Sequence, residues 1–411
     1  MKYTIDTPEN KAFVSELAEE LLRFAVHFPS PGGSAYYLKG DGSPWPEKTL
    51  DNYETCRMVH SYCIGKFLGF PGSDELIDAG LKGILGQLRD TTNGGWYTSL
   101  NPDGSPLPGK LCYAHAFVIL AAASATLAGH PQAEKLLHEA LELFDQRYWS
   151  EEEGLSRDTW DTTFTQLDDY RGINANMHTV EAFLAVADVT GDSTYRARAG
   201  RIIDHVIGWA KDNGWRIPEH YTKDWQPDLE CNHDQPDDRF KPYGATPGHG
   251  IEWARLITQW ALSTYPGQAE KWKPYVDAAE SLFCRAVGDG WNADGAPGIV
   301  YTTDWNGKPV VHDRMQWTLA EGINSSAVLY RVTGKKQYAG LYRDFLVYLD
   351  STVRDHTCGN WFHQLDQNNQ LMDTVWPGKP DIYHALQSML IPYCTPDLSV
   401  AVAIARKQYT L

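Results

Sequence analysis

The chain has 411 residues, of which 42% are hydrophobic and 22% charged, proportions that are ordinary for a globular protein. Its formal net charge of −17 argues against binding to nucleic acid or to an anionic membrane surface, because both need clustered Lys and Arg. No linker-like or low-complexity tract divides the sequence, so we expect residues 1–411 to form a single domain.

The N-terminal segment and the cysteines bear on cellular location. The first residues, MKYTIDTPENKAFVSEL, contain no apolar run of the kind found in signal peptides, and no stretch approaches a membrane span. The seven cysteines are odd in number and scattered, without a CxxC pair. We therefore expect reduced thiols and a cytoplasmic protein.

A unit of three parts repeats along the chain. Each unit begins with a stretch rich in Gly, Asn, Asp and aromatic residues, which predicts short strands and tight turns, at 93–106, 151–164, 297–310 and 358–371. An apolar helix is expected next, at 115–129, 178–191, 249–263 and 321–334. A more amphipathic, charged helix follows, at 131–148, 193–212, 267–287 and 335–353.

The two kinds of helix predict two layers. The first kind is apolar nearly all round and should be buried, whereas the second has one apolar stripe and should lie outside. Inner and outer helices that alternate six or seven times indicate an all-α fold, an (α/α)6 to (α/α)7 barrel with short β-hairpins in the loops at the mouth. An open α-solenoid is the alternative, and it would need capping repeats with polar outer faces.

An ionisable residue recurs near the start of each apolar helix. A structural repeat needs the same core residues each time, but it has no need for imidazoles. The recurrence therefore indicates a ring of functional groups that face one cavity, contributed by Arg57 with His60, His115, His178, His249, Glu321 and His384.

Two of these histidines have a carboxylate three residues further on, Glu252 after His249 and Glu181 after His178. A carboxylate at this spacing shares the helix face and can hold an imidazole in one tautomer. Imidazoles in a polar cavity suit proton transfer at a carbon next to a carbonyl, and Arg57 could stabilise the enediolate oxygen. Aldose–ketose isomerisation and C2 epimerisation share that intermediate.

Other chemistries have less support in the sequence. A His-x-x-Glu pair could bind a metal, but HExxH and Cys/His clusters are absent, so we expect no metal and no cofactor. Glycoside hydrolysis needs two carboxylates; Glu252, Glu321 and Asp381 could supply them, but the histidines would then be unexplained. GxSxG, P-loop and GxGxxG motifs are absent.

The sequence resembles the N-acylglucosamine 2-epimerase superfamily over nearly its whole length, and within it the bacterial aldose–ketose isomerase branch. The motifs that carry the resemblance are GGWY (94–97), YRGINANMHTVEAF (170–183), RFKPYGATPGHGIEW (239–253), GIVYTTDWNGKPVV (298–311) and GKPDIYHAL (378–386). The resemblance implies an (α/α) barrel, no metal cofactor, and a catalytic pair that matches His249 and His384. Other active-site positions of the family match Arg57, His178, Glu252 and Glu321, and a corresponding stretch contains Tyr113 and His115.

Two positions depart from the sulfosugar isomerases of this branch, which carry Gln where this chain has His363 and Pro380. Those Gln residues help to recognise a sulfonate. Arg239, the cation on the sulfonate side, is retained, although it could instead pair with a nearby carboxylate such as Asp237. The loss of both Gln residues favours unmodified D-mannose.

These observations lead to one preferred hypothesis, an aldose–ketose isomerase that interconverts D-mannose and D-fructose, with D-lyxose and D-xylulose as a further pair. We expect His249, oriented by Glu252, to assist ring opening, and His384 to move the proton between C2 and C1 of a cis-enediolate. We expect Arg57 and His178 to bind O1 and O2 and to steady the negative charge. Further substrate-binding candidates are Tyr113, His115, Asn176, Glu321, Trp317, Trp376 and Arg239, with Trp361 as another possible wall.

Several alternatives stay open at this point. The roles of the two catalytic histidines could be exchanged. The same residues permit a sugar 2-epimerase of the mannose/glucose, N-acylglucosamine or cellobiose type, or a sulfoquinovose isomerase. A toroid of helices could also serve as a protein-binding scaffold without activity, and the sequence permits a homo-oligomer.

Overall fold

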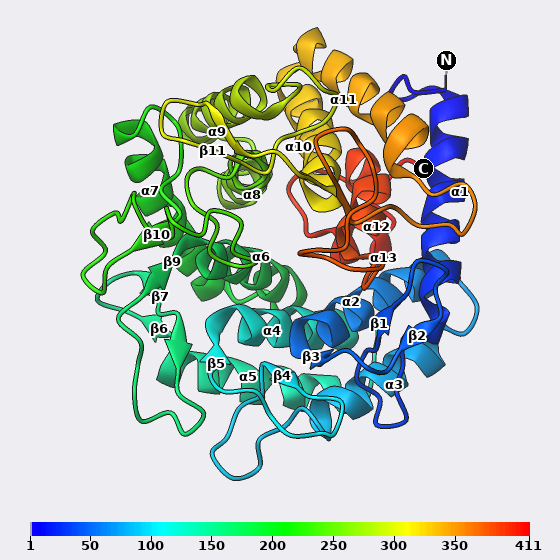
Figure 1. The fold of residues 1–411 in the computed structure, drawn as a ribbon, viewed down its shortest axis with the longest axis vertical. Coiled ribbons are helices and arrows are strands. Elements are labelled where there is room, and N and C mark those ends of the chain that lie inside the picture. The colour runs from blue at the N-terminus through cyan, green and yellow to red at the C-terminus, as the bar shows by residue number, and fades with distance from the viewer. Residues whose placement is uncertain (1) are drawn as a thin grey trace.

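The computed structural model describes residues 2–411 and shows two concentric layers of helices (Figure 1). The inner layer consists of α2 (Asn52–Leu68), α4 (Cys112–Leu127), α6 (Ile173–Thr190), α8 (Pro247–Thr264), α10 (Gln316–Thr333) and α12 (Tyr383–Leu390). The outer layer consists of α1 (Pro8–Phe24), α3 (Ser73–Leu85), α5 (Ala133–Arg147), α7 (Ser193–Asp212), α9 (Ala269–Gly290) and α11 (Lys336–Tyr348).

The inner layer is a ring because its last helix returns to its first. Helix α12 packs against α10 on one side and against α2 on the other, and α1 lies outside α12. The expected (α/α) barrel is therefore confirmed in its six-pair form, and the open solenoid is not the architecture of residues 2–411.

Burial explains the division into layers. In α4 every residue from 114 to 125 is buried, as expected for a helix that is apolar all round. Outer helices such as α7 bury one stripe and expose the rest. Inner helices start about one turn earlier than expected, with α6 at Ile173 and α10 at Gln316. Each follows a strand directly and has no side-chain N-cap, so the sequence does not mark the start.

Across residues 2–411, short antiparallel strand pairs lie at the mouth of the ring; three of them are hairpins of the kind expected, and four join neighbouring units. Pairs within one loop are β1 (Tyr37–Leu38) with β2 (Pro44–Trp45), β6 (Trp149–Ser150) with β7 (Leu155–Ser156), and β11 (Thr302–Thr303) with β12 (Pro309–Val311). Pairs between neighbouring units are β3 (Leu50–Asp51) with β4 (Ser99–Leu100), β5 (Lys110–Leu111) with β8 (Thr159–Trp160), β9 (Arg171–Gly172) with β10 (His220–Tyr221), and β13 (Arg314–Met315) with β14 (Gln364–Leu365).

The pairs between units position the site. The strands β3, β5, β9 and β13 each lead straight into an inner helix and pair with a strand of the following unit. The first turns of adjacent inner helices are thereby tied to one another at the mouth, so the polar residues on those turns face a common space.

The C-terminal segment fills the opposite end of the ring. After α12 the chain forms η3 (Ile391–Tyr393) and α13 (Val400–Ala405), and α13 packs against α2, α4 and α6. The outer helix expected at 335–353 ends at Tyr348 and continues as a π-helical turn, Leu349–Val353. A 3-10 turn, Ala25–His27, follows α1. All seven cysteines are unpaired, and within residues 2–411 no helix has the length and hydrophobicity to cross a membrane.

Candidate active site

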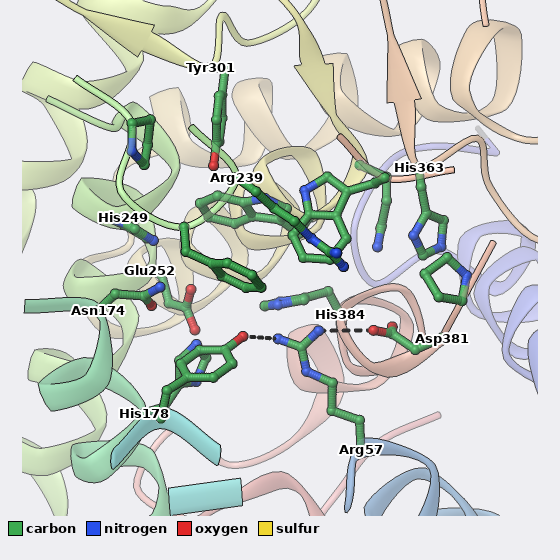
Figure 2. Close-up of a pocket in the computed structure, with 17 residues that line it drawn as sticks. Arg57, Asn174, His178, Arg239, His249, Glu252, Tyr301, His363, Asp381 and His384 are labelled. Atoms are coloured by element: carbon green, nitrogen blue, oxygen red, sulfur yellow. Dashed lines mark hydrogen bonds and ion pairs between the residues drawn. The ribbon is translucent and has the colours of Figure 1, made fainter. Parts of the chain in front are cut away.

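A cavity of about 680 Å³, including the part open to solvent, lies at the mouth of the ring (Figure 2). This volume is typical of small-molecule sites. Most of its wall is polar or aromatic, and its residues come from all six inner helices or the loops before them. They are Arg57, Tyr113, Asn174, His178, Arg239, Phe240, Pro242, His249, Glu252, Tyr301, Gln316, Trp317, His363, Trp376, Pro380, Asp381 and His384.

His249 is held by a carboxylate that the sequence analysis missed. Its Nδ1 lies 2.8 Å from Oε2 of Glu219, which is buried next to β10. Because a carboxylate only accepts, Nδ1 donates, so in the neutral tautomer that this contact selects Nε2 carries the lone pair. The expectation that Glu252 orients His249 is therefore wrong, although both residues lie on α8 and line the cavity.

His384 has an equivalent carboxylate partner. Its Nδ1 lies 3.1 Å from Oε1 of Glu321, and Oε2 of Glu321 accepts a hydrogen bond of 3.0 Å from Nε of Arg255. Burial alone would raise the pKa of Glu321, but the charge of Arg255 and the hydrogen bond from His384 outweigh it and hold that pKa below its usual value. Glu321 was expected to contact the substrate, but it does not line the cavity. It holds the His384 ring instead.

His178 and Glu181 form the pair that their spacing predicts, with Nδ1 and Oε2 3.1 Å apart. Tyr383 donates a hydrogen bond to the same carboxylate oxygen. Burial lowers the pKa of His178 to about 4, so the ring is neutral near pH 7. A neutral ring whose Nδ1 is already hydrogen-bonded presents an acceptor at Nε2. It carries no positive charge, so the expectation that His178 stabilises a negative charge on the substrate is not met.

Arg57 reaches into the cavity from α2 between two fixed partners (Figure 2). Its Nη1 donates to Oδ2 of Asp381 at 2.9 Å, and its Nη2 donates to the Tyr113 hydroxyl at 2.8 Å. The guanidinium also lies 4.7 Å from the ring centre of Phe117. Each terminal nitrogen keeps one further N–H, so Arg57 brings a fixed cation and free donors to the cavity.

The expected aromatic walls are present at two of three positions. The Trp317 indole packs near both proposed catalytic imidazoles, 5.1 Å from the His249 ring and 5.9 Å from the His384 ring, centre to centre. Trp376 lies beneath Arg239, whose guanidinium is 4.3 Å from its ring centre. Trp361 is fully buried and lies outside the cavity wall.

Arg239 bonds to tyrosines rather than to Asp237, the carboxylate suggested by the sequence. Its Nη2 donates to the hydroxyls of Tyr37 and Tyr53, the second at 3.1 Å. His363 and Pro380, the positions that differ from the sulfosugar isomerases, both line the cavity. Burial lowers the pKa of His363 to about 4, and its buried Nε2 has no hydrogen-bond partner within residues 2–411.

Besides Glu321, two further residues that were expected to bind substrate, His115 and Asn176, lie outside the cavity wall. Nδ1 of His115 is 2.8 Å from the Leu111 carbonyl oxygen, and Nε2 accepts from the Trp96 amide at 3.2 Å. Asn176 bonds to the backbone of Ser156 and Gly172. Both residues therefore fix loops to helices, and Asn174 takes the place expected for Asn176.

Glu252 occupies the floor between His178 and His384. Ligand atoms of Glu252 lie within 4.8 Å of those of His178 and Glu181, and also of those of Glu321 and His384. These are plausible metal ligands. Nη2 of Arg255 already lies 3.5 Å from Oε1 of Glu252, so a fixed cation supplies positive charge to this cluster.

Comparison with known proteins places the chain in a family. Residues 32–388 match the sequence profile of the N-acylglucosamine 2-epimerase family. The chain is 41% identical over 360 residues to the D-mannose isomerase of Pseudomonas cannabina pv. alisalensis, covering 87% of this chain and 86% of that protein. It is 40% identical over 403 residues to the D-mannose isomerase of Thermobifida fusca, covering 96% and 97%.

Solved structures agree with the sequence matches. A crystal structure of D-mannose isomerase superposes with a TM-score of 0.85 at 26% identity, covering 94% of this chain and 99% of that one. Cellobiose 2-epimerase from Spirochaeta thermophila DSM 6192 shares the fold, with a TM-score of 0.79 at 19% identity over 96% and 98% of the two chains. The chain therefore belongs to the N-acylglucosamine 2-epimerase family and is an enzyme of its isomerase and epimerase class.

Proposed function

We propose that this protein is an aldose–ketose isomerase that interconverts D-mannose and D-fructose without a metal. The observation that carries the proposal is the pair His249 and His384. Both imidazoles lie next to the Trp317 indole in one cavity, and the Nδ1 of each is hydrogen-bonded to a buried carboxylate. Both rings thus offer Nε2 as a proton acceptor. The similarity to D-mannose isomerases over almost the full chain supports the same substrate.

The proposed reaction begins with the pyranose ring. His249, oriented by Glu219, takes the proton of the anomeric hydroxyl and delivers it to the ring oxygen as the C1–O5 bond breaks, which yields the open-chain aldehyde and returns His249 to its neutral form. Nε2 of His384 then removes the proton from C2. The C–H electrons form the C1–C2 double bond, and the carbonyl electrons move to O1, giving a cis-enediolate.

The second half of the reaction returns the proton to the neighbouring carbon. His384 gives its proton to C1, the O2 proton passes to O1, and a carbonyl forms at C2, which is fructose. Arg57 carries the cation and N–H donors that stabilise the enediolate oxygen. The neutral His178 accepts a hydrogen bond from a sugar hydroxyl, and Trp317 and Trp376 supply flat apolar faces for the C–H groups.

The decisive experiment is to incubate the protein with D-mannose in D₂O and follow products by NMR. We expect fructose to form, deuterium to enter at C2 of mannose, and a chelator to leave the rate unchanged. His384→Gln should abolish both fructose formation and exchange, whereas the exposed His205→Gln on α7 should match the wild type. Absence of both fructose and exchange in the wild type would refute the proposal.

An anionic substrate is the first alternative. Arg239 lines the cavity, which favours a sulfonate, but the neutral His363 and the apolar Pro380 add no donor amide. A competition between mannose and sulfoquinovose decides the question, and we expect the larger kcat/KM for mannose.

Epimerisation at C2 is the second alternative, and one observation favours it. His249 and His384 come from different inner helices, α8 and α12, and both reach the cavity. Two bases on opposite faces of the enediolate would exchange mannose and glucose. Early appearance of glucose ahead of fructose would support this activity, and fructose as the first product supports the isomerase.

A further inference from the structure

A buried cation lies directly beneath the cavity floor. Arg255 is on α8, three residues after Glu252, and only 4% of it is exposed. It does not line the cavity at the mouth. It lines a second, smaller cavity at the rear, between the inner ring and the C-terminal segment 391–400. Arg255 therefore separates the site from the far end of the barrel.

The hydrogen bonds of Arg255 lead to the proposed base. Its Nε donates to Oε2 of Glu321 at 3.0 Å, and Oε1 of Glu321 lies 3.1 Å from Nδ1 of His384. A carboxylate whose two oxygens are both engaged cannot rotate away from the imidazole. The three side chains thus form one chain, in which the outer member orients the inner one.

Arg255 makes a close contact with Glu321 and a longer one with Glu252. The contact with Glu252 is 3.5 Å from Nη2 to Oε1, and Oε2 of Glu252 has no hydrogen-bond partner within residues 2–411. Burial, reinforced by the charge of Glu321, raises the pKa of Glu252 well above its usual value. The pKa of Glu321 lies below its usual value. The other charged or titratable groups that interact with this pair are Glu181, His178, Arg57, His384, Tyr383 and Tyr113.

We propose that Arg255 is a positioning residue: it fixes Glu321 against Nδ1 of His384, so that Nε2 of His384 is kept free to accept the substrate proton. The kinetic part of this inference rests on the proposed function, because it assumes that His384 removes the C2 proton. Its structural consequence, the tautomer of His384, can be measured without any substrate.

The kinetic test compares Arg255→Gln and Arg255→Lys with Gln259→Ala. Gln259 is one turn further along α8 and lines the same rear cavity, but it has no side-chain hydrogen bond within the described chain. We expect Arg255→Gln to lower kcat by about 10- to 100-fold, the range for outer partners of a site, with KM within about threefold of the wild type. Arg255→Lys should recover part of the loss, and Gln259→Ala should match the wild type.

The pH profile separates positioning from general damage. Without the guanidinium, Glu321 takes up a proton at higher pH, so the acid limb of kcat/KM should move to higher pH in Arg255→Gln. Loss of packing alone would lower the rate without moving that limb. If Arg255→Gln does not fold, Arg255→Lys is the second variant, because it keeps the charge but not the two-point contact. It should lower kcat, leave the acid limb near its wild-type position and give a mixture of His384 tautomers; a wild-type tautomer in Arg255→Lys would contradict the proposal.

A substrate-free measurement and a rescue complete the test. Nitrogen NMR of the His384 ring should show a proton on Nδ1 in the wild type and a mixture of tautomers in Arg255→Gln. Guanidinium at millimolar concentration should restore part of the activity of Arg255→Ala, because the enlarged rear cavity can admit it, whereas equal NaCl should not. If Arg255→Gln leaves both the His384 tautomer and the pH profile unchanged, the inference is overturned. If the tautomer changes but the wild-type protein is inactive on every sugar, only the proposed function is refuted.

Discussion

The contact between Glu219 and His249 leads to the sharpest prediction, which concerns Glu219→Gln. The substitution keeps the shape of the side chain but removes the charge that accepts the 2.8 Å hydrogen bond from Nδ1. A hydrogen bond to a charged group contributes about 1.5–3 kcal/mol, and about 1.4 kcal/mol corresponds to tenfold in rate. We therefore expect kcat/KM for mannose to fall by about 10- to 150-fold.

The loss should be larger if the amide turns its NH₂ group toward the imidazole. Nδ1 would then accept, the proton would move to Nε2, and His249 could no longer accept a proton from the sugar; a wrong tautomer of this kind can cost about 10⁴-fold in a catalytic triad. Steady-state rates and the nitrogen NMR spectrum of His249 distinguish the two cases.

The matched control is Glu134→Gln, because Glu134 is an exposed carboxylate in the first turn of α5. Its kcat/KM should equal that of the wild type. Glu252→Gln should leave the tautomer of His249 unchanged, because Glu252 is not its hydrogen-bond partner. Wild-type rates in Glu219→Gln would refute the role assigned to this contact.

Further predictions concern stability and the cavity wall. Burial lowers the pKa of four imidazoles in the folded protein to about 4, those of His60, His115, His178 and His363. Stability against urea should fall as the pH drops from about 6.5 to about 4, because in this range the imidazoles take up protons in the unfolded chain but not in the folded protein. Replacing one of the four by Gln should make stability depend less on pH. Asp90→Asn should cost about 3–5 kcal/mol in urea unfolding, because it leaves the fully buried Lys110 ammonium without its 2.7 Å partner; a loss below about 1 kcal/mol would contradict this reasoning. Gly248→Ala places a Cβ 2.6 Å from the Trp317 ring, so it should displace the indole, change its fluorescence and lower kcat. Gly340→Ala, which meets no atom within 4 Å, is the control and should leave activity intact.

The repeat made much of the fold predictable. Apolar periodicity located four of the six helices in each layer of the described chain, and Gly-rich stretches located several of the mouth strands, because these are local signals. The closure of the ring by α12 against α2 depends on contacts across almost the whole chain, and no local pattern encodes it.

The site was predictable in part for the same reason. Recurrence identified His178, His249 and His384, and the spacing His178–Glu181 was correctly interpreted. The partner of His249 was missed because Glu219 lies thirty residues earlier in a different loop. The sequence signal that could have identified Arg255 is a second charge, one turn after Glu252, on a helix that is buried over most of its length.

The exchange of Asn174 for Asn176 shows how sensitive such inferences are to helix phase. Two residues along an α-helix rotate the side chain by roughly 200°, so an uncertain start at Ile173 reverses which residue faces the cavity. Asn176 instead fixes the β7 region to α6.

The order of the inner helices has a consequence for synthesis in the cell. Arg57 and His178 belong to helices made early, whereas His384 lies on α12, shortly before the C-terminus, and α13 closes the ring from below. A nascent or truncated chain that lacks α12 and α13 would hold Arg57, His178 and His249 in an unclosed crescent, without His384. Activity should therefore emerge only when the segment that forms α12 and α13 has left the ribosome, and fragments that lack this segment should be inert toward the sugar.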